Sequence, residues 1–301
     1  MALYKNIIPG LVSFDTQLNQ IKGFEMCQDF DFFKNIAQKN QLHYKVVLSD
    51  NIETPPDYDM RSEYFINKEG FWHYERKIFF WKPKFKYDII NRVFYINKAY
   101  ASLPFRIGGI FIAGENISHL IELELFLRGC VLLRGIAARV NGKNIGISAP
   151  GFNGKTTLLK NLLRKGAQFI AENYLILDLT GGRVFPTCPI FKEVFWQRRR
   201  VDSELKELLK RQAVLDSPVI LDKLYLTQNS LNPNYQPESK KFIDFLLLNS
   251  LFFLNNLFVR SYIYEQGLAG AVSKRIEELA KFTNYQFIET KNFNFNFLSS
   301  V

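Results

Sequence analysis

The sequence predicts an α/β protein in which a smaller β-rich N-terminal domain, residues 1–115, precedes a larger core, residues 116–301. Three observations lead to this prediction. Aromatic and β-branched runs follow one another at short spacing in the N-terminal third. Helical and strand patterns alternate after residue 116, and a glycine-rich loop lies between a strand pattern and a helix pattern near the middle of the chain.

Successive β-type runs predict an antiparallel meander in the N-terminal domain. Strands are expected at residues 42–48, 71–82, 84–90 and 92–98, with turn-like residues such as Pro83 and Asn91 between the last three. A helix is expected to begin near residues 29–33. The basic and aromatic run from His73 to Trp81 would also suit a nucleic-acid surface, but the alternating faces of a half-buried sheet explain it better.

The core is expected to open with a helix at residues 117–133, with Asn116 or Ser118 as its N-cap. Two short apolar runs follow, Ile136–Val140 and Ile145–Ser148, and the Asn141-Gly142 pair between them is a strong hairpin signal. Farther along the chain, helices are expected at residues 157–165, 203–213, 237–257 and 273–282, and strands at residues 168–171, 174–179, 184–186, 219–227 and 285–289.

The composition of the chain limits the kinds of partner that it is expected to bind. The chain of 301 residues has 39 Lys and Arg against 29 Asp and Glu, which gives a net charge of +10. This excess suits an acidic partner, but the lysines are spread along the chain, so nucleic acid is not the expected partner. Cys27, Cys130 and Cys188 are far apart and show no metal spacing, which indicates buried thiols in a reducing compartment.

Targeting and membrane signals are also absent from the sequence pattern. The N-terminal residues lack the charged-then-apolar layout of a signal peptide. The longest apolar run, residues 242–259, is interrupted by Asp244 and Asn249, so a packed helix explains it better than a membrane span. We therefore expect a cytoplasmic protein without membrane association.

The segment Ala149–Thr156 matches the glycine-rich loop that binds nucleotide phosphates, except that Ala149 replaces the first glycine. A strand pattern leads into this loop and a helix pattern leaves it, so phosphates would lie at a helix N-terminus, where unpaired N–H groups favour anions. Lys155 would neutralise the β- and γ-phosphates, and the Thr156 hydroxyl would reach Mg²⁺. The residues expected to hold the nucleotide are Gly151, Asn153, Gly154, Lys155, Thr156 and Thr157.

Phosphoryl transfer also requires a carboxylate, either to hold the metal or to accept the proton of the acceptor. Glu172 lies 16 residues beyond Thr156, which is enough for one helix and one returning strand, so it could return to the loop. A solvated strand end is the alternative interpretation of Glu172. Asp178 is the other nearby carboxylate, but its place inside a strand pattern favours a terminating role.

Residues 125–193 resemble the HPr kinase-like P-loop proteins, which are related to phosphoenolpyruvate carboxykinases. The resemblance rests on Leu132–Lys143 before the loop, on the small residue in place of the first glycine, and on Leu162–Asn173 after the loop. It implies a P-loop kinase-like core preceded by a small N-terminal domain. It also implies phosphorylation of a serine on a peptide or protein, or of a small hydroxyl compound; some relatives modify precursor peptides in natural-product clusters.

By this resemblance, Lys155 and Thr156 hold phosphates and metal, and Glu172 is the catalytic base that takes the hydroxyl proton. The family usually has two adjacent aspartates where Glu172 and Asn173 stand, so Asn173 would help to bind Mg²⁺ without a charge. The family also tends to have a histidine before the loop, where Arg134 stands. An arginine cannot accept a proton, so these departures bear on catalysis more than on nucleotide binding.

The function expected from these features is ATP- and Mg²⁺-dependent phosphoryl transfer to a hydroxyl. Two alternatives stay open: a degenerate nucleotide-binding scaffold that recruits a partner without turnover, and a nucleotide hydrolase. Acceptor specificity is expected in residues 1–120 and 190–301, where the basic run Arg198–Arg200 would either reach phosphate or form a solvated face. The patterns identify neither the acceptor nor the oligomeric state, although the family often assembles.

Overall fold

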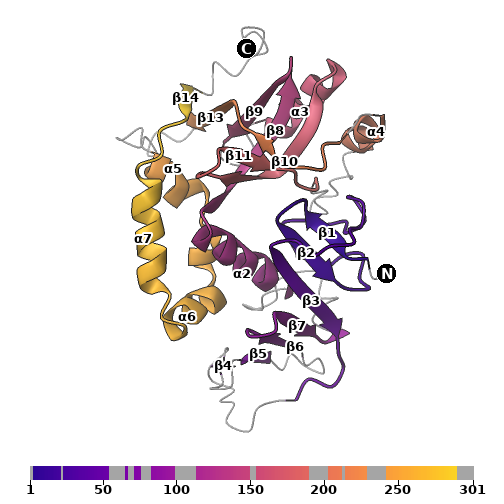
Figure 1. Ribbon diagram of the computed structural model, residues 1–301, viewed down its shortest axis with the longest axis vertical. Coiled ribbons are helices and arrows are strands. Elements are labelled where there is room, and N and C mark those ends of the chain that lie inside the picture. Colours follow the sequence, from indigo (N-terminus) through magenta and orange to yellow (C-terminus); the bar gives the residue numbers. More distant parts are fainter. Residues whose placement is uncertain are drawn as a thin grey trace. The chain divides into compact units, whose positions relative to one another are not determined.

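The chain forms two compact units, each with its own mixed sheet. The first consists of Met1–Leu123 together with Phe252–Ala269, and the second of Glu124–Leu251 together with Gly270–Val301. The computed structural model describes residues 3–21, 23–53, 65–66, 71–75, 83–98, 113–149, 154–189, 203–211, 214–228 and 242–289 (Figure 1). Strands and helices occur in both units, which confirms the α/β class.

The first unit is built on a mixed sheet. Among the described residues its strand order is β1 (Lys5–Ile8), β2 (Val12–Asp15), β3 (Leu42–Leu48), β7 (Val93–Ile96), β6 (Lys84–Asp88), β5 (Phe71–Glu75) and β4 (Phe65–Ile66). Strands β5, β6 and β7 form the predicted antiparallel meander. Strands β2, β3 and β7 pair in parallel, which the sequence pattern did not indicate. Residues 76–82 of the predicted run lie outside the described residues.

The helix expected to begin near residues 29–33 is wrong, because this segment forms turns and bends. The side chain of Asp29 accepts a hydrogen bond from the backbone N–H of Asp31 at 3.0 Å, and such local bonds compete with helix formation. The segment delivers Phe30 to an aromatic cluster in which its ring centroid lies 5.5 Å from that of Phe14 and 5.7 Å from that of Phe24. Tertiary burial of these rings therefore decides the local structure.

The second unit contains the predicted hairpin. Among the described residues its strand order is β12 (Val219–Ile220), β11 (Arg183–Phe185), β10 (Gln168–Asp178), β8 (Cys130–Val140), β9 (Lys143–Ser148), β13 (Lys223–Gln228) and β14 (Gln286–Glu289). The turn between β8 and β9 has Asn141 at φ 50° and Gly142 at φ 81°. Both residues are in the left-handed region, as a two-residue hairpin turn requires. Strands β9, β13 and β14 are parallel.

Among the described residues, the helices are α2 (Ala113–Leu127), α3 (Lys155–Arg164), α4 (Ser203–Arg211), α5 (Phe242–Asn249), the short 3-10 helix η1 (Phe252–Asn255), α6 (Leu257–Glu265) and α7 (Ala269–Leu279). The helix expected at residues 117–133 is wrong at both ends, because α2 already includes Ala113, so the N-cap expected at Asn116 or Ser118 lies inside the helix. It ends at Leu127, because Gly129 takes φ 89° and Arg275 donates to the Leu127 carbonyl through Nε and Nη2, each at 3.1 Å. Residues from Cys130 onward then enter β8.

Other boundaries also differ from the expectation; the helix expected at residues 273–282, for example, is α7 and begins at Ala269. The helix expected at residues 237–257 is broken where Leu251 takes φ 56°, and Asn256 caps α6 by accepting the Val259 N–H at 3.1 Å. The two strands expected at residues 168–171 and 174–179 are the single strand β10. The strand expected at residues 219–227 is split into β12 and β13. The split occurs because two consecutive backbone N–H groups donate to different parts of the chain. The N–H of Leu221 donates to the Gly182 carbonyl, and the N–H of Asp222 donates to the Asn144 carbonyl.

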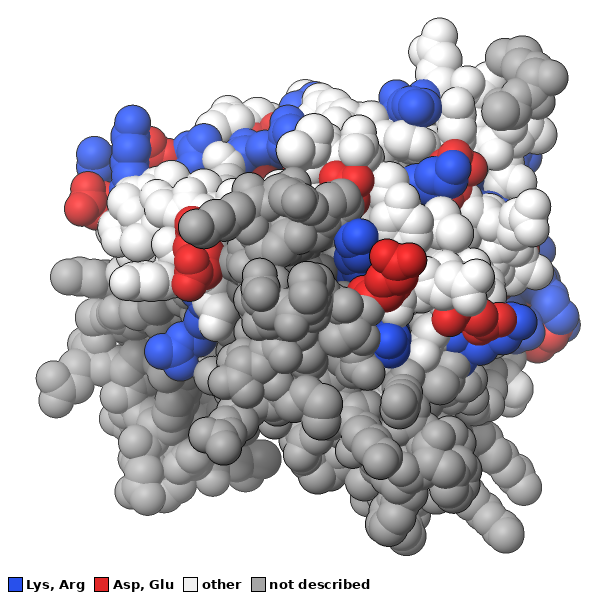
Figure 2. Space-filling model, turned by 90° about the horizontal axis from the view of Figure 1, so that it is seen from below, with Lys and Arg blue, Asp and Glu red and all other residues white. Residues whose placement is uncertain are grey.

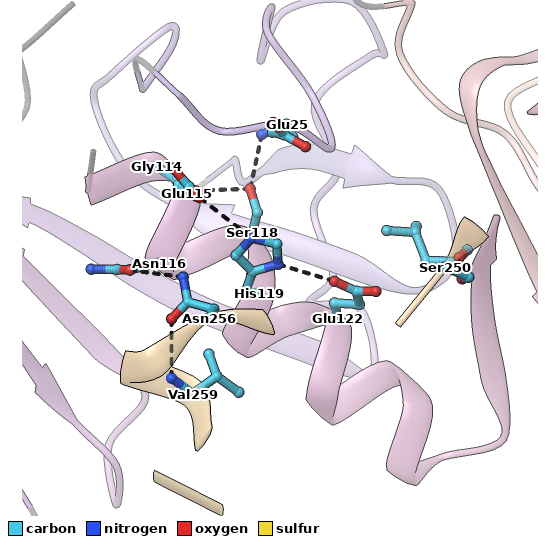
Figure 3. Close-up of polar contacts among 11 residues, drawn as sticks. Glu25, Gly114, Glu115, Asn116, Ser118, His119, Glu122, Ser250, Asn256 and Val259 are labelled. Carbon is cyan, nitrogen blue, oxygen red and sulfur yellow. Dashed lines mark hydrogen bonds and ion pairs between the residues drawn. The ribbon is translucent and has the colours of Figure 1, made fainter. Parts of the chain in front are cut away.

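A buried polar network lies along α2 in the first unit (Figure 3). The Ser118 hydroxyl donates to the Gly114 carbonyl and accepts the Glu25 N–H, both at 2.8 Å. His119 is 8% exposed; its Nδ1 lies 3.1 Å from a Glu122 oxygen and its Nε2 lies 3.8 Å from a Glu115 oxygen. Burial opposes the charged imidazole, but the hydrogen bonds and charges of the two glutamates outweigh it and raise the pKa of His119 to about 9.

No helix among the described residues is long and apolar enough to cross a membrane.

We expect the free energy of unfolding to fall as the pH rises from 6.5 toward 9. The pKa of His119 is higher in the folded protein than in the unfolded chain, so its stabilising effect is complete below pH 6.5 and is lost as the pH rises through about 9. The variant His119→Gln should lose about 3 kcal/mol at pH 6, since it leaves two buried carboxylates without their imidazolium. Urea unfolding midpoints measured between pH 6 and 9.5 check this. The variant should show a flatter pH profile than the unaltered protein, and equal slopes would contradict the assignment.

Candidate functional site

The candidate site begins where β9 ends and α3 begins. Gly154 precedes the helix at φ 72°, and no side chain caps the helix there. The helix forms because Leu158, Leu159, Leu162 and Leu163 bury one face. Its first backbone N–H groups have no partner inside the helix, so this end favours an anion. The described part of the segment thus has a strand that ends at Ser148 and a helix that begins at Lys155, as expected, while residues 150–153, which include Gly151 and Asn153, lie outside the described residues.

Glu172 lies beside the first turn of α3. The Thr156 hydroxyl Oγ1 donates to the Glu172 carboxylate Oε1 at 3.0 Å. Glu172 is 6% exposed, so it is not a solvated strand end. The strand register explains this approach. Glu172 of β10 pairs with Ile136 of β8, and Ile136 pairs in turn with Ile147 of β9, the strand that leads to α3. The structure therefore brings together two residues that are 16 positions apart in sequence.

Lys155 and Thr157, the other described residues expected to contact nucleotide, occupy the same helix turn. The Lys155 ammonium Nζ donates to the Ala149 carbonyl at 2.8 Å, which holds it across the base of the loop. Thr157 is exposed. The cation, the hydroxyl of Thr156 and the carboxylate of Glu172 are therefore grouped at one helix end, which is the set of groups that phosphate and Mg²⁺ require.

Asn173 is next to Glu172 in β10 but takes φ 68°, a left-handed conformation that asparagine tolerates better than most residues. It keeps its place in the sheet by pairing with Gly135. Its side-chain nitrogen Nδ2 is buried and has no hydrogen-bond partner among the residues that the structure describes. Over the same residues, no hydrogen bond joins Asn173 to the Thr156–Glu172 pair.

Arg134 acts at the base of the loop through its backbone. Its carbonyl accepts the Ser148 hydroxyl at 2.8 Å and the Ala149 N–H at 3.2 Å. These bonds fix the last residue of β9 and the first residue of the loop. The buried Ser148 was not selected from the sequence, although a hydroxyl at the end of the strand entering such a loop is a signal that could have been used.

Asp178 does not belong to the site. Its carboxylate accepts from the N–H groups of Thr180 and Gly181, both at 3.0 Å, and from Arg183 Nη2 at 2.8 Å. Burial opposes this charge, but the hydrogen bonds outweigh it and lower the pKa of the carboxyl. Asp178 therefore stabilises the turn between β10 and β11, in agreement with the terminating role expected for it.

A cavity of about 250 Å³ lies elsewhere in the second unit, beside the first residues of β8. Its walls include Phe126, Val131, Leu179, Leu279 and Phe282. None of the groups near Thr156 lines it. Within the described ranges, no three or more His, Cys, Asp or Glu side chains are grouped so as to hold a metal ion.

On the face shown in Figure 2, the described Lys and Arg residues are interspersed with Asp and Glu. The expected basic run Arg198–Arg200 lies outside the described residues.

No protein-family model matches the chain, and no curated protein matches it either.

Gly135 should be sensitive to substitution, because a Cβ there would lie 2.6 Å from the Ile147 carbonyl oxygen. We expect Gly135→Ala to cost about 2 kcal/mol, since the backbone would have to move. Gly270→Ala is the matched control, because a Cβ at Gly270 meets nothing within 4 Å and alanine favours the helix. Thermal unfolding compares the two, and equal midpoints would contradict the predicted close approach.

Proposed function

We propose that the protein transfers a phosphoryl group from ATP, with Mg²⁺, to a hydroxyl on a peptide, a protein or a small compound, in the cytoplasm. The observation that carries this proposal is the 3.0 Å hydrogen bond from Thr156 to Glu172 at the N-terminus of α3. It groups a metal-binding hydroxyl, a carboxylate and an anion-favouring helix end. Lys155 in the same turn adds the positive charge that polyphosphate requires.

The residues present fit Mg²⁺, which prefers oxygen ligands and is usually held by one or two carboxylates together with substrate phosphates. The Thr156 hydroxyl is such an oxygen and would hold the metal together with substrate phosphates, whereas the Glu172 carboxylate, which accepts a hydrogen bond from this hydroxyl at 3.0 Å, would take the acceptor proton instead of binding the metal. Bound Mg²⁺ would neutralise phosphate charge, while Lys155 would balance the remainder.

Glu172 is suited to accept the proton of the attacking hydroxyl, because in the structure it already accepts a hydrogen bond from one. In the transfer, the new bond forms between the acceptor oxygen and the γ-phosphorus. The bond from that phosphorus to the β-phosphate oxygen breaks, and the acceptor proton passes to Glu172. This role is compatible with a serine hydroxyl or with any alcohol of similar reach.

A nucleotide-binding scaffold without turnover is the second candidate. The observation that favours it is Asn173, a neutral residue in left-handed backbone where the similar family has a second aspartate. An amide is a weaker Mg²⁺ ligand than a carboxylate, so nucleotide could bind while transfer is slow.

The Lys155→Ala variant tests nucleotide binding. We expect its affinity for ATP in the presence of Mg²⁺ to fall about tenfold, as loss of a hydrogen bond to a charged group predicts. Lys165→Ala, at the other end of α3, is the matched control and should keep its affinity. Calorimetry with ATP measures both. If the unaltered protein bound no ATP, the proposed function would be wrong.

The Glu172→Gln variant separates the two candidates. With γ-labelled ATP, we expect phosphate release or self-labelling to fall at least about a hundredfold while ATP affinity stays within about threefold. Glu207→Gln, on the exposed surface of α4, controls for loss of a carboxylate. If Glu172→Gln left turnover unchanged, Glu172 would not have the proposed role. If the unaltered protein bound ATP but showed no turnover, even with serine peptides and small alcohols supplied, the result would favour the scaffold.

A further inference from the structure

Thr227, in β13, has a buried hydroxyl that the fold does not use. The residue is 1% exposed, and its Oγ1 has no hydrogen-bond partner within the described ranges. A buried hydroxyl without a partner loses its hydrogen bonds to water and gains none in return, which lowers the stability of the folded protein. Valine has the same shape without this cost, so packing alone does not explain a threonine here.

The hydroxyl lies at the edge of the sheet from which the loop leaves. Strands β9 and β13 are parallel, and Ser148, the last residue of β9, pairs with Leu226. Thr227 follows Leu226, so it is level with Ala149, the first residue of the loop. In sheets of this kind, ligands bind beyond the carboxyl ends of parallel strands.

Thr227 also lies on the face of the sheet that carries Glu172. Tyr225 of β13 pairs with Ile147 of β9. Ile147 pairs with Ile136, which pairs in turn with Glu172. Paired residues share a face, as do alternate residues of one strand. Thr227 comes two residues after Tyr225, so it shares the face on which Glu172 meets α3.

From these positions we infer that the Thr227 hydroxyl donates a hydrogen bond to a phosphate oxygen of the bound nucleotide. The inference rests on the proposed function and adds a binding residue to it. Two independent observations point to the same anion: the uncapped N-terminus of α3 and a buried donor without a partner, on the same face and at the same edge of the sheet. A phosphate oxygen would supply the acceptor that the described residues do not provide at Thr227.

The test compares Thr227→Val with Thr227→Ser, using calorimetry with ATP in the presence of Mg²⁺. Thr227→Val should bind ATP about tenfold more weakly, because it loses one hydrogen bond to a charged group. Thr227→Ser keeps the hydroxyl and should stay within about threefold of the unaltered protein. A second titration with inorganic phosphate distinguishes the nucleotide from free phosphate as the source of the anion.

Thermal unfolding without ligand provides a readout independent of binding. Thr227→Val should unfold at the same temperature as the unaltered protein or higher, because it removes a buried group without a partner. A clear drop in its unfolding temperature would show that the hydroxyl has a structural partner and would overturn the inference.

The binding outcomes also separate the two proposals. Equal ATP affinities of Thr227→Val and the unaltered protein would overturn this inference and leave the proposed function standing. An affinity loss confined to inorganic phosphate would overturn it as well. An unaltered protein that binds no ATP would overturn both.

Discussion

The candidate site depends on the register of β8 with its two neighbours. Gly135 of β8 lies opposite Ser148 of β9 on one side and opposite Asn173 of β10 on the other. Side chains alternate between faces, so a slip of one residue in the β8–β10 pairing would turn Glu172 away from Thr156. The absence of a side chain at Gly135 permits the close approach of β8 to β9, because a Cβ there would lie 2.6 Å from the Ile147 carbonyl oxygen of β9. This glycine thus allows β8 to lie between the strand that leads into α3 and the strand that carries Glu172.

Local chemistry accounts for the parts of the fold that the sequence predicts well. Asn141-Gly142 specifies a tight turn on its own, and the leucines of α3 specify a helix face. The errors occur where a distant contact decides. The apolar run after Leu127 continues the helical pattern, and only Gly129 and the distant Arg275 end the helix. In the sequence, Asn173 reads as a break between two strands, but its pairing with Gly135 of β8 keeps β10 continuous across this position.

The sequence predicts the parts of the candidate site that are close together along the chain. The loop and the spacing to Glu172 are local or nearly local in sequence, so their approach could be anticipated. Thr227 could not be selected, because its place beside Ala149 depends on a parallel pairing between segments 78 residues apart, shown by the register of Ser148 with Leu226. Arg134 illustrates a further limit: the pattern drew attention to its side chain, whereas its carbonyl is the group that holds Ser148 and Ala149.

The composition of the first unit has a consequence for folding during synthesis. Residues Phe252–Ala269 belong to it, although most of the second unit is translated before them. Phe258 packs against Phe85 with ring centroids 5.6 Å apart, so an early strand gains this neighbour only after 173 further residues (258 − 85) have been made. The N-terminal portion therefore emerges from the ribosome with an incomplete core. The two units are interleaved along the chain, and a fragment ending at residue 251 would lack part of the first.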